Sequence, residues 1–359
     1  FGLPELVERV KFANFDTRLK AERVYQARQA IQAARGNLLP RLNMNTIITA
    51  AVSVIDPTNV GGLVGDVVPF IFPNRWYALK EAGLFYDAEK YSYASLVANQ
   101  IGAVEELYFN VLSGQIYSKH LGDYESYLQE LYTLALSQEK AGQIPVGFAS
   151  RLFRNRVLAV ESDIVSIQEL LVREYSSLSV AAGLSPIEGI SALEQVSPPP
   201  IGQNLKLTAE GTVTQSLANS LAIKELLYLE EAAKKTFKVI EYSFLDPQAD
   251  PSLSLGFGYA ANLNVSRSHI NEVKVRAVST AMETEARVKS TVALVNRIVD
   301  QYALSSEARD NSKELLRLTT SRMAREGIVD ATEVLIVVDP LLKSEIAQAQ
   351  LELTYMAAR

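Results

Sequence analysis

The sequence contains no cysteine and only two histidines among its 359 residues. The missing cysteines exclude disulfide bonds, thiolate metal sites and cysteine nucleophiles. His120 and His269 lie far apart, and Tyr124 occupies the position four residues after His120, where a helical metal site would need a second ligand. Neither a phosphate-binding glycine loop nor a nucleophile elbow occurs. We therefore expect a protein that is not an enzyme and that holds no cofactor and no metal.

Long apolar runs and an excess of basic charge are missing as well. No stretch of 18 consecutive apolar residues occurs, so the sequence predicts no transmembrane helix. The net charge of −6 argues against a nucleic-acid partner, whereas 48% hydrophobic residues allow a large buried core. The chain starts at Phe1 without methionine, so we expect a mature form or a trimmed piece, and any signal peptide or lipid-modified cysteine would have been lost with the removed part.

Glycine and proline are absent from the 68 residues between Gly258 and Gly327. At average usage about eight would be expected in such a stretch. Apolar residues recur in it at spacings of three and four, namely Val288, Val292, Val295, Val299 and Tyr302. This spacing is typical of an amphipathic helix with a coiled-coil-like seam. A helix of about 60 residues would be about 90 Å long.

One design occurs twice in the sequence. Residues 1–183 and 207–359 each predict a short helix, an Ala-Asn turn, a longer helix, a Pro-x-Leu strand segment, a very long helix, a glycine turn and a last helix. A linker, residues 184–206, contains three consecutive prolines and joins the two repeats. The two very long helices are expected to end immediately before Gly142 and Gly327.

Three further helices of the first repeat carry the same kind of apolar seam. The seam positions are Val24, Ala27, Ile31, Ala34 and Leu38, then Leu121, Tyr124, Leu128, Leu131 and Ala135, and finally Val157, Val160, Ile164, Ile167 and Leu171. Helices that share such seams and are joined by tight turns pack antiparallel as hairpins.

Two segments between the helices show a period of two instead, which predicts β-hairpins at about 42–73 and, shorter, at about 252–266. The apolar residues that alternate in them are Ile48, Val52, Val54, Leu253, Leu255, Phe257 and Tyr259. These side chains could face lipid, or they could pack a small soluble sheet against the helices.

The order of these elements resembles the TolC-like outer-membrane efflux protein family over essentially the whole chain. The most specific part is Arg325–Arg359, REGIVDATEVLIVVDPLLKSEIAQAQLELTYMAAR, which is similar to the family's Gly-x-x-x-x-x-(Asp/Glu)-Val-Leu turn and following helix. The opening stretch, closed by Asn37-Leu38-Leu39-Pro40, is also similar. The resemblance implies a mainly α fold of long antiparallel coiled-coil hairpins in two tandem repeats with short β-hairpins. It further implies a periplasmic helical tunnel joined to an outer-membrane barrel to which three chains contribute strands.

The function that the resemblance implies is an exit duct for drugs, metals or secreted polypeptides, in the outer membrane and periplasm of a Gram-negative bacterium. The implied partners are two further copies of the chain, a periplasmic adaptor, an inner-membrane pump and outer-membrane lipid. The second hairpin has only about seven residues per arm, however, and a membrane-crossing strand needs about 9–11. One alternative is therefore a TolC-shaped, non-channel envelope scaffold, monomeric or differently assembled, whose hairpins have degenerated. A cytoplasmic coiled-coil scaffold is another, but it leaves the repeated Pro-x-Leu segments unaccounted for.

Candidate site residues lie at the two helix-hairpin tips. By resemblance, three copies of Glu333, near Asp330, would constrict the pore and favour cations. The residues alone predict a capping box with Asp330 as N-cap and Glu333 at N3, and the two interpretations are compatible. By resemblance again, Gly142, Phe148 and Gly327 would contact the adaptor. The residues alone predict a structural role for the two glycines, which supply the left-handed conformation that ends a helix.

Overall fold

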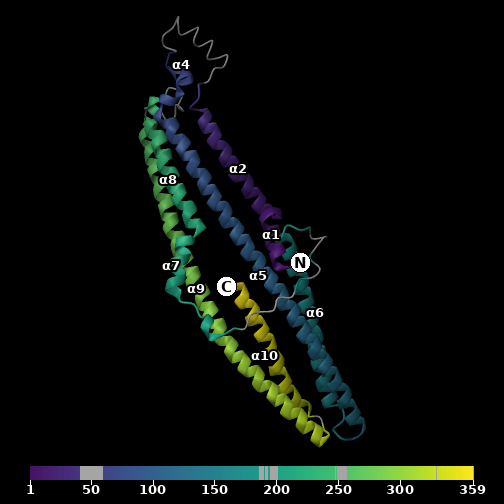
Figure 1. Cartoon of the computed structure of the whole chain (residues 1–359). Helices are drawn as coiled ribbons and strands as arrows, with labels where there is room; N and C mark the ends of the chain where they lie inside the picture. The colour runs from purple at the N-terminus through teal and green to yellow at the C-terminus, as the bar shows by residue number, and fades with distance from the viewer. Residues whose placement is uncertain are drawn as a thin grey trace. The chain divides into compact units, whose positions relative to one another are not determined.

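The computed structural model describes residues 1–40, 60–185, 190, 193–194, 201–246, 248, 257–328 and 330–358. These residues are helical for most of their length (Figure 1). The part of the chain that is described contains no β-strand. The prediction of a mainly α protein with long helices is therefore confirmed.

The helices follow one another in an order that occurs twice: short, medium, very long and long. The first series is α1 (Leu3–Ala13), α2 (Phe15–Gly36), α5 (Pro73–Lys140) and α6 (Ala149–Ala181), with 11, 22, 68 and 33 residues. The second is α7 (Ala209–Asn219), α8 (Leu221–Tyr242), α9 (Phe257–Glu326) and α10 (Ala331–Ala358), with 11, 22, 70 and 28 residues. Shorter elements are α4 (Val60–Val67) and the 3-10 helices η2 (Pro69–Ile71), η3 (Gln203–Leu205) and η4 (Ser243–Leu245). The repeat boundary at 184–206 stays a prediction.

The ends of the helices follow from local chemistry. Pro73 opens α5, where its missing N–H would have no helical acceptor in any case. Ser220 caps α8 by accepting a hydrogen bond from the backbone N–H of Ile223 at 3.3 Å. The very long helices end at Lys140 and Glu326, next to the predicted glycine turns. Both predicted ends are thus confirmed.

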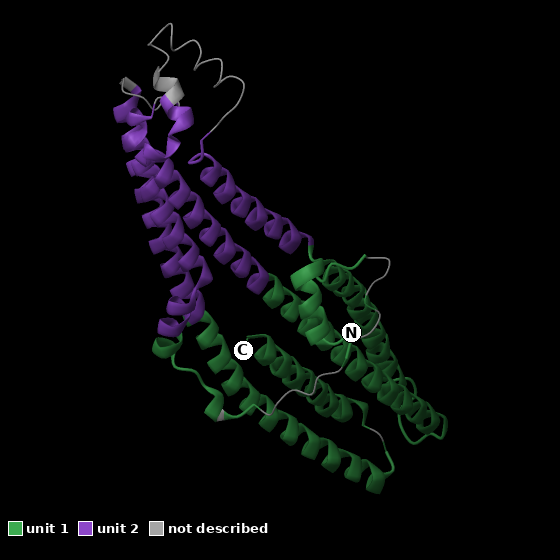
Figure 2. Ribbon diagram, turned by 45° about the horizontal axis from the view of Figure 1, so that its top comes forward, with its two compact units in different colours: residues 1–14, 100–212, 289–359 green, residues 15–99, 213–288 purple. Residues whose placement is uncertain are grey.

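The chain divides into two compact units (Figure 2). Unit 1 comprises residues 1–14, 100–212 and 289–359, and unit 2 comprises residues 15–99 and 213–288. The two very long helices contribute residues to both units.

Unit 1 has an extensive apolar core. Every predicted seam residue of α5 is buried, and in α6 the seam residues Val157, Val160 and Ile167 are buried. They pack with Ala331, Val334 and Val338 of α10 in one cluster. A second cluster joins α1, α5 and α6 through residues such as Leu6, Tyr108 and Leu178. The spacing of apolar residues therefore identified the packed faces of these helices correctly.

Fewer apolar side chains are buried in unit 2 than in unit 1. The predicted seam residues of α2, Val24, Ala27, Ile31 and Ala34, are only half-buried. Between α5 and α8, Tyr77 stacks on Tyr242 with ring centroids 5.6 Å apart, and Tyr91 stacks on Tyr228 at 5.3 Å. Aromatic stacks of this kind contribute about 0.5–1.5 kcal/mol beyond their buried area.

The strands predicted for the ends of the two hairpins are wrong where the structure describes them. Residues 60–67 form α4, and its C-terminal turn is stabilised because the Gly65 carbonyl accepts a hydrogen bond from Arg75 Nη1 at 3.2 Å. Residues 257–266 belong to α9. A helix gains one hydrogen bond per added residue, and no proline follows Phe257 for the whole length of α9, so the helix extends through this short alternating stretch.

Candidate functional site

The tip between α5 and α6, in unit 1, is closed by a left-handed glycine. Gly142 has φ +70°. Its N–H donates to the Glu139 carbonyl at 3.2 Å, and the Gln143 N–H donates to the Gln138 carbonyl at 3.0 Å. This pair of hydrogen bonds is the Schellman arrangement, which satisfies the last carbonyls of a helix. The structural role predicted for Gly142 is confirmed.

A buried carboxylate fixes the other side of the same tip. Glu139 Oε1 accepts a hydrogen bond from the Ser150 backbone N–H at 2.9 Å, and Oε2 accepts one from the Ser150 hydroxyl at 2.8 Å. The hydrogen bonds from Ser150 lower the pKa of Glu139 below its ordinary value. Between these anchors Val146 is 84% exposed and Phe148 is 64% exposed. The tip thus presents two exposed apolar side chains between two hydrogen-bonded anchors.

The tip between α9 and α10 has the predicted cap. Gly327 has φ +69°, and its N–H donates to the Met323 carbonyl at 2.8 Å. Asp330 Oδ1 accepts hydrogen bonds from the backbone N–H groups of Thr332 at 3.0 Å and Glu333 at 3.1 Å. Asp330 is therefore the N-cap of α10, as predicted.

Glu333 has a partner that the sequence did not suggest. Its carboxylate forms an ion pair with the Arg322 guanidinium on α9, whereas the predicted capping box assigns it to the backbone at Asp330. The two tips are also linked to each other, because Gln138 Nε2 donates to the Gly327 carbonyl at 3.0 Å. Glu333 thus lies on the first turn of α10, in a region where side chains tie the two hairpins together.

A polar triad of Tyr124, Arg156 and Asp339 lies in unit 1, away from the two tips. The Tyr124 hydroxyl donates to Asp339 Oδ1, and Arg156 Nε donates to the same oxygen at 3.2 Å. Burial raises the pKa of Tyr124 far above its ordinary value, and the hydrogen bond to the Asp339 carboxylate raises it further. The phenol therefore stays protonated. The triad joins α5, α6 and α10. Tyr124 was predicted only as a seam residue, because its partners are distant in sequence.

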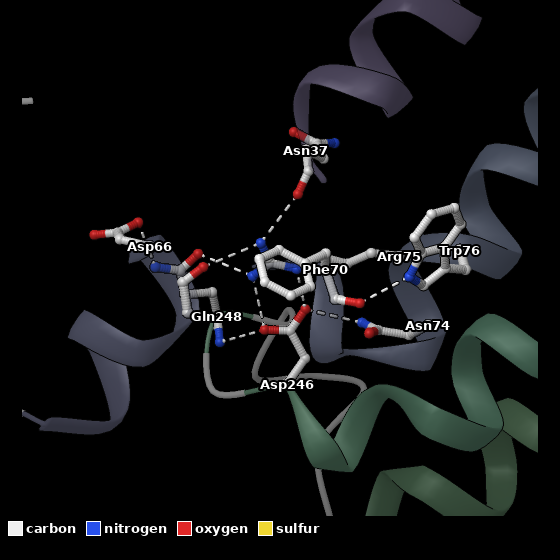
Figure 3. A network of polar contacts seen from close by, with 9 residues as sticks. Asn37, Asp66, Phe70, Asn74, Arg75, Trp76, Asp246 and Gln248 are labelled. Atoms are coloured by element: carbon white, nitrogen blue, oxygen red, sulfur yellow. Dashed lines mark hydrogen bonds and ion pairs between the residues drawn. The ribbon is translucent and has the colours of Figure 1, made fainter. Parts of the chain in front are cut away.

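In unit 2 the densest polar network surrounds Arg75 (Figure 3). Arg75 Nε donates to Asp246 Oδ2 at 2.7 Å, and Nη2 donates to Oδ1 at 2.9 Å. The remaining donors reach the carbonyls of Asn37 at 3.1 Å and Gly65 at 3.2 Å, and Gln248 Oε1 at 3.0 Å. One guanidinium therefore joins the end of α2, α4, the start of α5 and the residues after η4.

The ion pair at the centre of this network is buried. The Arg75 side chain is 8% exposed and that of Asp246 is 4% exposed. Burial alone would raise the pKa of Asp246, but hydrogen bonds from Arg75, from Asn74 at 3.0 Å and from the Gln248 backbone N–H outweigh it. The pKa of Asp246 is therefore held below its ordinary value, and the carboxylate is charged at neutral pH.

The remaining sequence-predicted residues fall into two groups. Ile48, Val52, Val54, Leu253 and Leu255 lie outside the described residues. Phe257 and Tyr259 lie in the first turn of α9, where the Tyr259 hydroxyl donates to the Glu241 carbonyl at 2.8 Å. A role of these residues in contacting lipid stays a prediction.

Neither histidine lies in a group that resembles a metal centre. His120 Nδ1 is 3.9 Å from Glu345 Oε2, and His269 Nδ1 is 3.4 Å from Glu272 Oε2. Within the described ranges, no group of three or more histidine, aspartate or glutamate side chains could hold a metal ion. Also within those ranges, no helix combines the length and the apolar character needed to cross a membrane.

No family model matches the sequence, and no curated protein matches it. Solved structures do match, each over 99% of this chain. The outer membrane protein VceC of Vibrio cholerae matches over 94% of its own chain, with a TM-score of 0.73 and 12% identity. The CmeC outer membrane channel of Campylobacter jejuni matches over 83% of its own chain, with a TM-score of 0.75 and 13% identity. The MtrE outer membrane channel of Neisseria gonorrhoeae matches over 86% of its own chain, with a TM-score of 0.67 and 14% identity.

At these identities the comparison concerns the fold alone. The long hairpins of this chain have the fold of TolC-like outer-membrane channels, so the resemblance that the sequence suggested is confirmed at the level of fold.

Proposed function

We propose that this protein is the outer-membrane exit duct of an efflux or type I secretion system. The observation that carries the proposal is the match of 99% of the chain to channels of this fold, at TM-scores of 0.67 to 0.75 in the three comparisons above. The two helical series would be structural repeats, residues 1–183 and 207–359, joined by the linker 184–206. A duct performs no chemistry of its own, since an energised partner drives transport.

The proposed assembly is a homotrimer in the envelope of a Gram-negative bacterium, in contact with outer-membrane lipid. Its helix-hairpin tips would face a periplasmic adaptor, which in turn contacts an inner-membrane pump. Gly142, Phe148 and Gly327 are the proposed contact points, and the exposure of Phe148 supports this role. Asp330 and Glu333 would line the constriction, with Glu333 giving the cation preference expected of a ring of carboxylates.

One observation favours a second candidate function. Residues 257–266, which were predicted as part of the second hairpin, belong to α9, so they do not supply a membrane-crossing strand of about 9–11 residues. A chain of this kind would be a TolC-shaped envelope scaffold that does not conduct. In that case the helical hairpins would serve as a spacer or docking module.

Light scattering of the detergent-extracted protein separates the two. The exit duct predicts a detergent-corrected mass of three copies that requires detergent to stay in solution. A monodisperse monomer that needs no detergent would contradict the duct and favour the scaffold. The Arg75 network and the tip caps are expected in both cases, because they stabilise a single chain.

A further inference from the structure

Unit 1 contains a hollow of about 300 Å³ where α5, α9 and α10 come together (Figure 1). We call it the α5–α10 groove. It is lined by two tyrosines, four aliphatic side chains, two carboxylates and one histidine. A hollow of this size, mainly apolar and with a few polar groups, lies at the lower end of the range in which proteins bind small molecules.

The groove is formed by one face of α5 and one face of α10. On α5, His120, Asp123 and Tyr127 follow one another at spacings of three and four residues, so their side chains lie on the same side of the helix. On α10, Val338 and Glu345 are seven residues apart, which is two turns. Each helix therefore contributes both apolar and ionisable side chains to the groove.

The two ends of the groove differ in polarity, because α5 and α10 run antiparallel there. His120 Nδ1 is 3.9 Å from Glu345 Oε2, and four residues further along α5 the Tyr124 hydroxyl donates to Asp339, which precedes Glu345 on α10. The polar end thus lies at the level of His120 and Glu345, and the apolar end lies at the level of Tyr127. Seven residues of helix separate the two levels, about 10 Å.

The apolar end is part of the packed core of unit 1. Val338 belongs to the buried cluster, and Tyr127 and Leu316 are partly buried against it. Between the two ends, the Tyr124 ring is fixed by its hydroxyl hydrogen bond and by the Arg156 guanidinium, which lies 5.7 Å from the ring centroid. A wall that is fixed before a ligand arrives needs less ordering on binding.

At the polar end, negative charge exceeds positive charge. Lys313 Nζ pairs with Glu345 Oε1 at 3.2 Å. Asp123 is exposed and, among the residues that the structure describes, takes part in no ion pair. His120 carries a charge only when it is protonated. One carboxylate is therefore left for a positively charged group, whereas an anion would be repelled.

We propose that the α5–α10 groove binds a small aromatic amine. Its ammonium group would lie at Asp123 and Glu345, and its ring would lie against Tyr127 and Val338. The tyrosine rings add to the attraction, because aromatic faces attract cations. The groove lies within unit 1 of a single chain, so this inference goes beyond the exit duct and applies equally to a scaffold.

The experiment compares three compounds that share one naphthalene ring and differ in charge. They are 1-naphthylmethylamine, which is a cation at neutral pH, the uncharged 1-naphthylmethanol and the anion 1-naphthylacetate. Equilibrium dialysis of the full protein measures their binding, with the same detergent on both sides of the membrane so that uptake by micelles cancels.

Two pairs of variants probe the two ends of the groove. Asp123→Asn removes the unpaired carboxylate, and Asp163→Asn makes the same change at an exposed position of α6 outside the groove. Leu316→Ala shortens the apolar wall, and Leu315→Ala makes the same change at the neighbouring residue, which is 53% exposed and does not line the groove.

The amine should bind saturably and about tenfold more tightly than the alcohol, because it forms charge-assisted hydrogen bonds, and the acetate should bind most weakly. Asp123→Asn should bring the amine close to the alcohol, and Asp163→Asn should leave the difference unchanged. Leu316→Ala should weaken both compounds, and Leu315→Ala should weaken neither.

Three results would overturn the inference. The first is the absence of saturable binding of the amine. The second is equal binding of amine and alcohol to the wild type, and the third is an equal effect of the Asp123 and Asp163 variants. The mass in detergent tests the exit duct separately, so failure of the groove to bind the amine leaves the duct untouched.

Discussion

At the scale of single residues, Arg75 and Asp246 matter most, because they place a full charge pair in a site with little access to water. The Arg75 guanidinium uses its Nε, Nη1 and Nη2 donors on five acceptors from separate parts of unit 2. A buried ion pair of this kind is stable only when its remaining donors are also satisfied. The pair therefore defines one geometry for the end of unit 2.

Replacing one partner should be costly. Asp246→Ala leaves the Arg75 charge buried without its counter-ion, so we expect a loss of about 3–5 kcal/mol in the free energy of unfolding. Urea titration monitored by Trp76 fluorescence measures it, because Trp76 adjoins Arg75. The double variant Arg75→Met, Asp246→Leu should lose clearly less, since no unpaired charge remains. Equal losses in the single and double variants would contradict the assigned role.

The same pair predicts a dependence on pH. Because folding lowers the pKa of Asp246, its contribution to stability is present above the unfolded value of about 3.9 and is lost as the pH falls through the folded value. The difference in unfolding free energy between wild type and Asp246→Asn should therefore shrink as the pH is lowered from about 5. A difference that stays constant down to pH 2 would show that the carboxylate does not titrate with folding.

Sequence reasoning found the residues that act locally and missed those that act over long distances. Asp330, Gly142 and Gly327 could be assigned because a cap or a helix end is decided within a few residues. Arg75 and Asp246 are 171 positions apart, and each stands in an ordinary polar context in the sequence. Only the packing of α5 against the end of α8 brings them together.

At the scale of elements, the helices follow from the distribution of glycine, proline and apolar residues. The length of α9 was underestimated because α9 includes residues 257–266, which were predicted as part of a hairpin. Alternation in Leu253–Tyr259 covers two turns of helix at most, and so short a pattern does not distinguish a strand from a helix that later residues extend. The seams of α5 and α6 identified the buried faces of these helices correctly, because their apolar residues recur at the same spacing over several turns.

Two glycines of the first long hairpin offer a matched test of this local account. A Cβ added to either Gly122 or Gly142 meets no atom within 4 Å, but only Gly142 has a positive φ. Gly142→Ala should therefore destabilise unit 1 by about 1–2 kcal/mol. Gly122→Ala should stabilise it by up to about 1 kcal/mol, through helix propensity. Hydrogen exchange of α5 amides measures both, and shifts in the same direction would contradict the assignment.

At the scale of the whole molecule, the proposed function is a duct assembled from three copies of the chain. The fold comparison supports the helical part, and the Arg75 network explains how one chain fixes the end of unit 2 where the predicted membrane segments begin. What remains to be tested is whether ions pass through the assembled protein.

Ion selectivity tests the constriction. Glu333→Gln removes a carboxylate and also releases the Arg322 guanidinium from its ion pair, so both changes should lower the preference for cations. Reversal potentials in a potassium chloride gradient measure this preference. Glu314 forms an exposed ion pair with Arg317 on α9. Glu314→Gln should therefore leave the cation preference unchanged. Equal shifts in both variants would indicate a general charge effect and would remove Glu333 from the constriction.

The most direct test of the central claim is the conductance of the purified wild-type protein in a planar lipid bilayer. The account predicts discrete, cation-selective current steps that appear only after protein is added. Silent bilayers, together with flotation showing that the same protein is inserted in vesicles, would contradict the exit duct and leave an envelope protein that has the shape of a channel subunit without its conductance.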